Sequence, residues 1–423
     1  MGLNSDKVFP SASGKVSRRK FLLGGLAGIP LLPWWKELAA ESLRLRGGGA
    51  ASVDEPRKRL RELGIAIGDL PPGKYNTITD VKGIMVGSTT IIKDYKNAKG
   101  ETKSIRTGVT AILPNGGNIY HEHLFAGFFN QNGWGEMTGI VPLLADGLLK
   151  TPIYLTGTYN IGIVYDAAIT HMLNECPDIM EQPIIPSPVV AECFDSYLSD
   201  VEERAIAEED VLKAIAKAKG GMVEEGAVGG GTGHTTFGFK GGIGTSSRVL
   251  PEKDGGYTVG VLVMSNTARL TQLRVDGVPV GKEFRKSGYT GEEGCKSIIL
   301  IAATDAPLFS FQLKKVGKRV AMGLAQMGAI SGTGSGDIIL AFSTANRIPL
   351  KSKSPLQKIT ALNDNLITPV YQAIVEATQE AILNSMTMAR TITGRKGNTA
   401  QAIPLHRLVE IMKKYYRLER RKP

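Results

Sequence analysis

The sequence predicts a mixed α/β protein. Short runs rich in Val and Ile alternate along the chain with stretches whose apolar residues recur every three or four positions. These are the patterns of buried strands and amphipathic helices. The 51 glycines are spread through turns without a fixed period, which excludes collagen-like and solenoid folds. This order of elements fits a layered sandwich with two central sheets and outer helices.

The individual elements follow from the same patterns. Strand-like apolar runs occur at residues 84–92, 109–113, 153–157, 188–192, 259–264, 297–303 and 338–343. Helical periodicity occurs at residues 165–173, 211–218, 312–327, 368–389 and 405–416. The 423-residue chain exceeds a typical single core, but no linker-like change in composition divides residues 53–423. We therefore expect one large domain there.

Residues 1–52 are expected to be an export signal and linker. SRRKFLL, at residues 17–23, matches the twin-arginine pattern, and an apolar stretch extends from residue 21 to residue 35. These 15 residues contain Gly and Pro and are short for a membrane span. The sequence therefore predicts translocation by the twin-arginine export machinery and a periplasmic or secreted enzyme. A short anchoring helix is the alternative.

The formal net charge of +11 does not indicate nucleic-acid binding. Residues 1–40 contribute +4 and residues 413–423 contribute +5, so the body of the chain is close to neutral. A basic terminal helix is most often a solvated end, although it can touch an anionic surface. We expect no nucleic-acid partner.

Two segments carry candidate catalytic residues. GCKSIILIAATDAPL, at residues 294–308, places Ser297 at the first position of a buried strand. SGTGSGDIILAFSTAN, at residues 331–346, places Ser335 and Asp337 two residues apart, so their side chains share a face of an extended strand. A serine hydroxyl needs an adjacent base and an orienting group, and these three residues can form such a relay. A simple tight turn at GTGSGD is the competing interpretation.

Both segments resemble the β-subunit of the DmpA family, the self-cleaving serine aminopeptidases that include L-aminopeptidase/D-esterases and β-peptidyl aminopeptidases. The resemblance extends from about residue 64 to residue 408. It includes TGVTAILPNGG (107–117), FAGFFNQNGWGEMTG (125–139), PVVAECFD (188–195), GAVGGGTG (226–233), FKGGIGTSSR (239–248) and GVLVMSN (260–266). It implies a four-layer αββα sandwich related to the N-terminal-nucleophile hydrolases. It also implies self-cleavage between Lys296 and Ser297, giving subunits of residues 53–296 and 297–423.

The same resemblance implies roles for site residues. Ser297 would be the nucleophile, assisted by Ser335 and Asp337, and its freed α-amine, with an ordinary pKa of roughly 7.7 to 8.0, could serve as general base. Asn266 would bind the oxyanion, where one donor is worth about 2.7 to 4 kcal/mol, together with backbone amides near Ser335 and Gly336. Glu192 would hold the substrate's free amine, since a buried carboxylate favours a cationic partner.

The chain departs from the family pattern at two positions. Lys296 stands where better-known members have Gly or Asn, and Phe194 stands where some members have a tyrosine near the substrate. The implied substrates are short peptides, amides or esters with a free amine, cut through an acyl-enzyme. We also expect a homo-oligomer of processed subunit pairs. An ornithine-acetyltransferase-like acyltransferase and a noncatalytic small-ligand-binding protein of the same fold are the alternatives.

Neither a metal nor a nucleotide cofactor is expected. Cys176, Cys193 and Cys295 lack CxxC spacing, and a disulfide framework is not indicated. His121 and His123 would point the same way from a strand, but no third ligand lies at a recognisable spacing. The glycines of GGGTG, at residues 229–233, invite a dinucleotide-binding interpretation, but no strand precedes them and no amphipathic helix follows. They are expected to bring backbone against the cleft or to turn the chain between sheets.

Overall fold

Two β-sheets stacked between helical layers form the core of the computed structural model, which describes residues 55–182, 184–291 and 297–418. One sheet has the strand order β1-β2-β5-β6 and the other β4-β3-β12-β11-β10-β9. The strands of the first sheet are β1 (Met85–Lys96), β2 (Thr102–Leu113), β5 (Ile153–Gly157) and β6 (Val189–Cys193). Those of the second are β3 (Glu122–Gly133), β4 (Leu148–Leu149), β9 (Gly242–Val249), β10 (Thr258–Asn266), β11 (Ser297–Thr304) and β12 (Gly336–Pro349).

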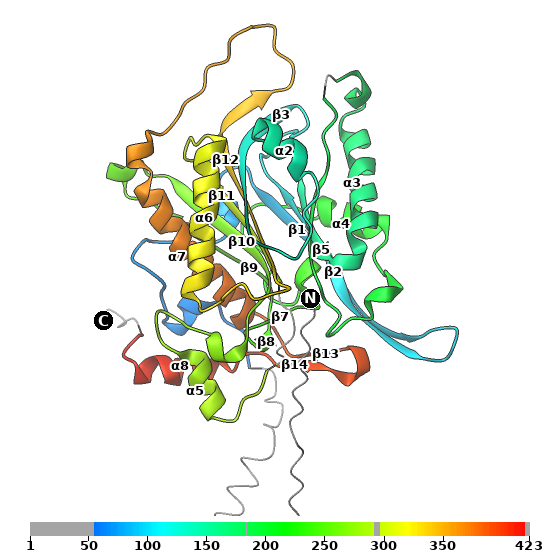
Figure 1. Ribbon diagram of the computed structural model, residues 1–423, viewed down its shortest axis with the longest axis vertical. Helices are drawn as coiled ribbons and strands as arrows, with labels where there is room; N and C mark the ends of the chain where they lie inside the picture. Colours follow the sequence, from blue (N-terminus) through cyan, green and yellow to red (C-terminus); the bar gives the residue numbers. More distant parts are fainter. Residues whose placement is uncertain (1–54, 183, 292–296, 419–423) are drawn as a thin grey trace, which may run out of the picture. The chain divides into compact units, whose positions relative to one another are not determined.

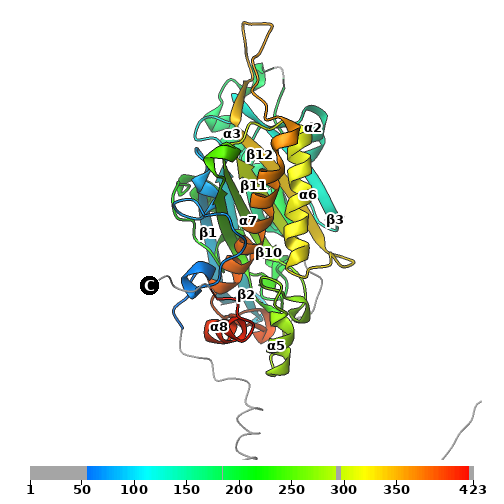
Figure 2. The ribbon, with the colours of Figure 1, turned by 90° about the vertical axis from the view of Figure 1, so that its left-hand side faces the viewer.

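Helices cover the outer face of each sheet. Helices α3 (Ile161–Glu175) and α4 (Glu208–Ala216) pack on the first sheet, and α6 (Ser310–Gln326) and α7 (Thr368–Thr387) pack on the second. Figures 1 and 2 show α6 and α7 side by side over β9 to β12. The other α-helices are α2 (Ile140–Asp146), α5 (Val280–Lys286) and α8 (Leu405–Lys414), and two short ribbons pair β7 (Thr235–Thr236) with β8 (Phe239–Lys240) and β13 (Ile392–Thr393) with β14 (Thr399–Ala400).

The central strand β11 shows why the layers stack. Side chains alternate across a strand, so Ile298 and Leu300 face the core under α6 and α7, while Ile299 and Ile301 face the core between the sheets. A third core lies between the first sheet and its helices, where Val109 of β2 is buried. Three apolar cores separate four layers, and the predicted αββα sandwich is confirmed. No helix in the described part of the chain is long and apolar enough to cross a membrane.

The glycines of the GGGTG segment turn the chain between the two sheets. Gly229–Gly231 forms a buried 3-10 turn. A Cβ at Gly230 would lie 2.5 Å from the carbonyl oxygen of Leu155 in β5, and one at Gly231 would lie 2.4 Å from the backbone nitrogen of Ile243 in β9. Because these glycines are needed for contact with both sheets and are buried, they have no surface to offer a nucleotide phosphate.

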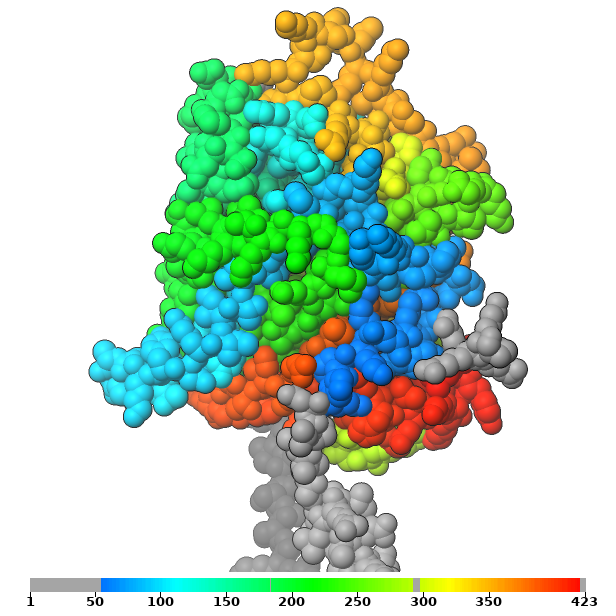
Figure 3. Space-filling model, turned by 180° about the vertical axis from the view of Figure 1, so that it is seen from behind, coloured from blue at the N-terminus to red at the C-terminus, as the bar shows by residue number. Residues whose placement is uncertain are grey.

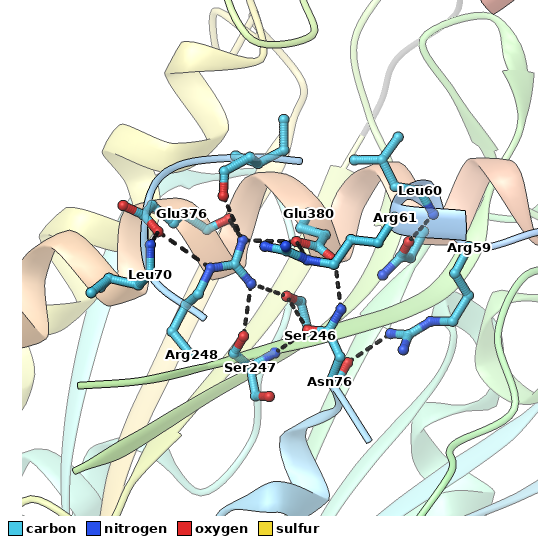
Figure 4. Close-up of polar contacts among 12 residues, drawn as sticks. Arg59, Leu60, Arg61, Leu70, Asn76, Ser246, Ser247, Arg248, Glu376 and Glu380 are labelled. Atoms are coloured by element: carbon cyan, nitrogen blue, oxygen red, sulfur yellow. Dashed lines mark hydrogen bonds and ion pairs between the residues drawn. The ribbon is translucent and has the colours of Figure 1, made fainter. Parts of the chain in front are cut away.

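A buried polar network joins the N-terminal segment to α7 and β9 (Figure 4). Arg248 is fully buried, and its Nη2 donates to Glu380 Oε2 at 2.8 Å. Arg61 also pairs with Glu380, at 3.0 Å, from the segment ahead of β1. On the rear face this segment lies against the C-terminal region (Figure 3), where Arg57 Nη2 donates to the carbonyl of Ile403 at 3.1 Å. Residues before and after position 297 are therefore held together by buried charged contacts.

Candidate active site

The candidate catalytic residues lie where three neighbouring strands of the second sheet meet one edge. Asn266 is the last residue of β10, Ser297 is the first of β11 and Gly336 is the first of β12. Antiparallel pairing places Asn266 directly opposite Ser297. Parallel pairing places Asp337 beside Ile298, so Gly336 lies next to Ser297. Residues separated by as many as 70 positions in the sequence thus converge through strand register alone.

Ser297 is mostly buried, with 8% of its surface exposed. Its Oγ accepts a hydrogen bond from the backbone N–H of Gly336 at 3.0 Å. This contact places a backbone N–H donor beside the hydroxyl. When the hydroxyl attacks a substrate carbonyl, negative charge develops on the carbonyl oxygen close to this donor. Lys296 and Cys295, on the other side of the expected cleavage point, lie outside the described residues.

Ser335 and Asp337 form a hydrogen-bonded pair beside the candidate nucleophile. The hydroxyl of Ser335 donates to Asp337 Oδ1 at 2.6 Å. Burial raises the pKa of Asp337, while hydrogen bonds from serine side chains oppose that rise. The turn at GTGSGD therefore delivers a paired hydroxyl and carboxylate to the sheet edge that holds Ser297.

The side chain of Asn266 has a fixed orientation. Its Oδ1 accepts from the backbone N–H of Thr235 at 3.1 Å, and its Nδ2 donates to the carbonyl of Phe194 at 2.9 Å. An amide group carries two N–H bonds, and among the described residues only the carbonyl of Phe194 accepts from this one, so the second N–H can serve a developing oxyanion. The fixed amide is a preorganised donor, which is the property that stabilises charge in a transition state.

Glu192 is a buried carboxylate near the same edge, at the end of β6. Its Oε1 accepts from the backbone N–H of Glu136 at 3.0 Å, and its Oε2 accepts from the hydroxyl of Thr158. Burial raises the pKa of Glu192, and both hydrogen bonds oppose that effect. In this setting an ammonium group is a favourable partner for the carboxylate.

Gly135 connects Glu192 to the nucleophile edge. A Cβ at this position would lie 3.2 Å from the Cα of Gly336 and 3.3 Å from Glu192 Oε1. Gly336 is equally restricted, because its Cβ would lie 2.5 Å from the carbonyl oxygen of Trp134. The GWG sequence therefore allows this backbone to pass between the carboxylate and the serine.

Aromatic side chains stand at the edge of the site. Phe194 is 45% exposed and makes an edge contact with the ring of Tyr159, with 5.8 Å between ring centroids. Trp134, beside Gly135, is also exposed. Tyr159 therefore places a tyrosine ring next to Phe194, the position where some family members have a tyrosine.

Sequence reasoning did not identify several supporting residues. Thr158 binds Glu192, and Lys240 supports the turn that orients Asn266. The buried Lys240 ammonium donates to the carbonyl of His234 at 2.6 Å and to that of Gly241 at 2.7 Å, although burial lowers its pKa to about 7. Neither residue lies within the motifs that contain Ser297 and Ser335. The one available signal was a lysine inside the otherwise apolar and glycine-rich FKGG.

Comparison with known proteins agrees with this geometry. The model of peptidase family S58 matches residues 76–400. The chain is 39% identical to a β-peptidyl aminopeptidase of Sphingosinicella microcystinivorans, with 88% of this chain and 95% of the relative covered.

Two solved structures extend the comparison to the fold. The PH0078 protein of Pyrococcus horikoshii has a TM-score of 0.80 and 46% identity, covering 85% of this chain and 100% of that one. The L-aminopeptidase D-Ala-esterase/amidase of Ochrobactrum anthropi, described as a variant of the Ntn-hydrolase fold, has a TM-score of 0.78 and 37% identity, covering 86% and 100%. The chain is therefore a serine aminopeptidase and belongs to peptidase family S58, the DmpA family of self-processing enzymes.

Proposed function

We propose that this enzyme is cut between Lys296 and Ser297 and then removes the N-terminal residue from short peptides, amides or esters that carry a free amine. The hydrogen bond between Gly336 N–H and Ser297 Oγ is the observation that carries the proposal. This hydrogen bond supports the assignment of Ser297 as the nucleophile, because its hydroxyl already lies beside a donor that can bind the oxyanion.

In the proposed reaction Ser297 Oγ attacks the substrate carbonyl and its proton passes to the freed α-amine of Ser297. Asn266 Nδ2 and Gly336 N–H stabilise the oxyanion. The leaving amine or alcohol then takes up the proton as the bond to the carbonyl breaks, which leaves an acyl-enzyme. Water hydrolyses this ester and regenerates the hydroxyl. The pair formed by Ser335 and Asp337 would orient the α-amine and stabilise its charged form.

Glu192 would select substrates with an unblocked N-terminus. A buried carboxylate stabilises a substrate ammonium more strongly than an exposed one, because less water competes for it. Only the backbone of Gly135 lies between this carboxylate and Gly336. The site for the substrate amine is therefore close to the nucleophile, which favours cleavage after one N-terminal residue. Since curated relatives are named β-peptidyl aminopeptidases, we include N-terminal β-residues among the proposed substrates.

The proposal also includes export by the twin-arginine machinery, a periplasmic or secreted location and assembly of the processed pairs into a homo-oligomer. The support for export is SRRKFLL at residues 17–23, which lies outside the described residues. Fractionation of cells carrying the wild type or Arg18→Lys with Arg19→Lys would test it. Export by this route is supported if the double variant stays in the cytoplasm while the wild type leaves it. It is contradicted if the double variant leaves the cytoplasm as the wild type does.

A serine-directed sulfonyl fluoride tests the catalytic assignment. Peptide mapping of the inactivated enzyme should place the adduct on Ser297, and a slow-turnover substrate with a free amine should protect against it. The same substrate with an acetylated amine should not protect. An adduct on Ser335, or inactivation without any serine adduct, would overturn the assignment.

A further inference from the structure

Three metal-ligating side chains that are far apart in the sequence meet at the opposite end of the sheets from Ser297. His121 lies just before β3, Cys176 follows the last residue of α3, and Asp178 precedes a short 3-10 turn at Ile179–Glu181. His121 Nε2 lies 3.1 Å from Cys176 Sγ and 3.2 Å from Asp178 Oδ1. The third side of this triangle, from Cys176 Sγ to Asp178 Oδ1, is 3.3 Å. We propose that this triad is a zinc-binding site.

The spacing of the three ligand atoms fits one tetrahedral ion. Zinc binds His nitrogen at about 2.0 to 2.1 Å, Cys sulfur at about 2.3 Å and carboxylate oxygen at about 2.0 to 2.2 Å, with tetrahedral angles. Those bonds place neighbouring ligand atoms roughly 3.4 to 3.6 Å apart. The distances in the triad are a few tenths of an ångström shorter, so a small outward movement admits the ion. Water would complete the tetrahedron.

The chemistry of the triad favours zinc over magnesium or calcium. A thiolate and an imidazole are ligands for Zn²⁺ and other late transition metals, whereas magnesium and calcium prefer sites made of oxygen atoms. In the metal-free state the thiol of Cys176 donates to Asp178 Oδ1. Zinc would replace that proton, which leaves to solvent.

Neighbouring residues orient the carboxylate toward the other two ligands. Asp178 Oδ1 faces His121 and Cys176, while Oδ2 accepts from the side chain of Gln182 and lies 3.3 Å from Lys351 Nζ. Such outer contacts commonly fix the ligands of metal sites. Lys351 is exposed, and an exposed lysine–carboxylate pair is worth little, so it does not prevent a cation from binding Oδ1.

The location indicates a structural role for the ion. It would tie the end of α3, in the outer layer of the first sheet, to the start of β3 in the second sheet. Along β3, 11 residue steps separate Gly133, which pairs with Gly336 beside Ser297, from Glu122. At about 3.3 Å per residue these ends are roughly 35 Å apart. Zinc at the triad should therefore stabilise the fold without entering the aminopeptidase reaction.

This inference differs from the expectation drawn from the sequence. On a strand, His121 and His123 would point the same way, but β3 begins at Glu122, and His123 is buried within it while His121 precedes it. The other two ligands are Cys176 and Asp178, which lie 55 and 57 residues further along the chain than His121. Linear spacing could not indicate this meeting.

Titration of the chelator-treated full-length enzyme with Co²⁺, followed by displacement with Zn²⁺, tests the proposal. We expect one equivalent of cobalt to bind with a thiolate-to-metal charge-transfer band, and zinc to abolish the band and raise the Tm. Cys176→Ser should lose the band, and His121→Ala and Asp178→Asn should bind more weakly. Cys193→Ser and His406→Ala are the matched thiol and imidazole controls and should keep it.

Aminopeptidase activity reports whether each variant is folded. A folded, active Cys176→Ser variant without the band supports the site. If an unfolded Cys176→Ser variant prevents that comparison, weaker cobalt binding by folded Asp178→Asn serves the same purpose. Absence of cobalt binding to the wild type, or a band that persists in folded Cys176→Ser, would show that the triad is only a hydrogen-bonded cluster.

Discussion

Asn266 and Ser297 lie directly opposite each other on the antiparallel strands β10 and β11. This pairing couples the candidate oxyanion donor to the candidate nucleophile through backbone hydrogen bonds, the most rigid connection that a sheet provides. The side chain of Asn266 is held in turn by Thr235 and Phe194. The position of the donor is therefore set before any substrate arrives.

Asn266→Ala should lower kcat by about 100- to 1000-fold while KM changes little, because an oxyanion donor acts mainly in the transition state. Steady-state kinetics on an amino-acid amide measures both constants. Asn346→Ala is the matched control, since Asn346 is also nearly buried and bonded to backbone but lies near the other end of β12. Equal losses of kcat in both variants would indicate general damage rather than a lost donor.

Glu192 should produce a second, more acidic step in the pH dependence of activity, below the step due to the α-amine that serves as general base. Because burial raises the pKa of its carboxyl, the group takes up a proton at a higher pH than an ordinary glutamate, and kcat/KM should fall again as pH falls through that raised value. Glu192→Gln should remove this second step, keep the first, and lower kcat/KM roughly 30-fold or more, which corresponds to about 2 kcal/mol.

The matched control for Glu192→Gln is Glu122→Gln, which changes a half-exposed carboxylate paired with Arg347 at the far end of β3. Its profile of kcat/KM against pH should match that of the wild type. If the more acidic step persists unchanged in Glu192→Gln, Glu192 does not recognise the substrate amine.

Gly135→Ala should raise KM. Expressed as a free energy, this rise in KM should exceed the loss in the free energy of unfolding. The added methyl group would lie 3.3 Å from Glu192 Oε1 and 3.2 Å from Gly336 Cα, so either the carboxylate or the nucleophile edge must shift. Gly162→Ala, at a helical glycine whose Cβ would have no neighbour within 4 Å, is the control and should leave KM unchanged. A wild-type KM in Gly135→Ala would show that this gap does not bear on substrate binding.

Arg248→Met should destabilise the protein by about 3 to 5 kcal/mol, because it leaves Glu380 buried without one of its cationic partners. The free energy of unfolding is best measured in the Ser297→Ala background, in which we expect a single uncut chain. Arg407→Met, which breaks the exposed pair with Glu410, should cost less than about 1 kcal/mol. Similar losses in the two variants would contradict the importance assigned to the buried network.

The layered fold was predictable because its central strands are apolar on both faces. β5 was predicted with its observed bounds, and β10 and β11 within two residues, since a strand buried between two layers is a continuous apolar run. β3 and β9 were missed. β9 carries Thr245 and Arg248, and this polar composition resembles a loop until the buried partners in α7 and the N-terminal segment are known.

The candidate site was predictable only in part for a similar reason. Ser297, Ser335 and Asp337 stand in short motifs whose chemistry can be read locally. The support from Thr158 and Gly135 depends on contacts with residues that are distant in the sequence. Strand pairing and the stacking of the two sheets create these contacts, and no local pattern describes them. Lys240 acts within its own segment, on the carbonyl of His234, but a lysine in a glycine-rich stretch does not by itself indicate burial.

Intact mass combined with N-terminal sequencing of freshly purified wild type and Ser297→Ala is the most direct test of the catalytic assignment. We predict that the wild type contains a chain beginning at Ser297, that the variant remains a single uncut chain, and that the two wild-type chains stay associated through the network around Arg248. A wild type that remains uncut while fully active, or a Ser297→Ala variant that is still cut before residue 297, would contradict the account.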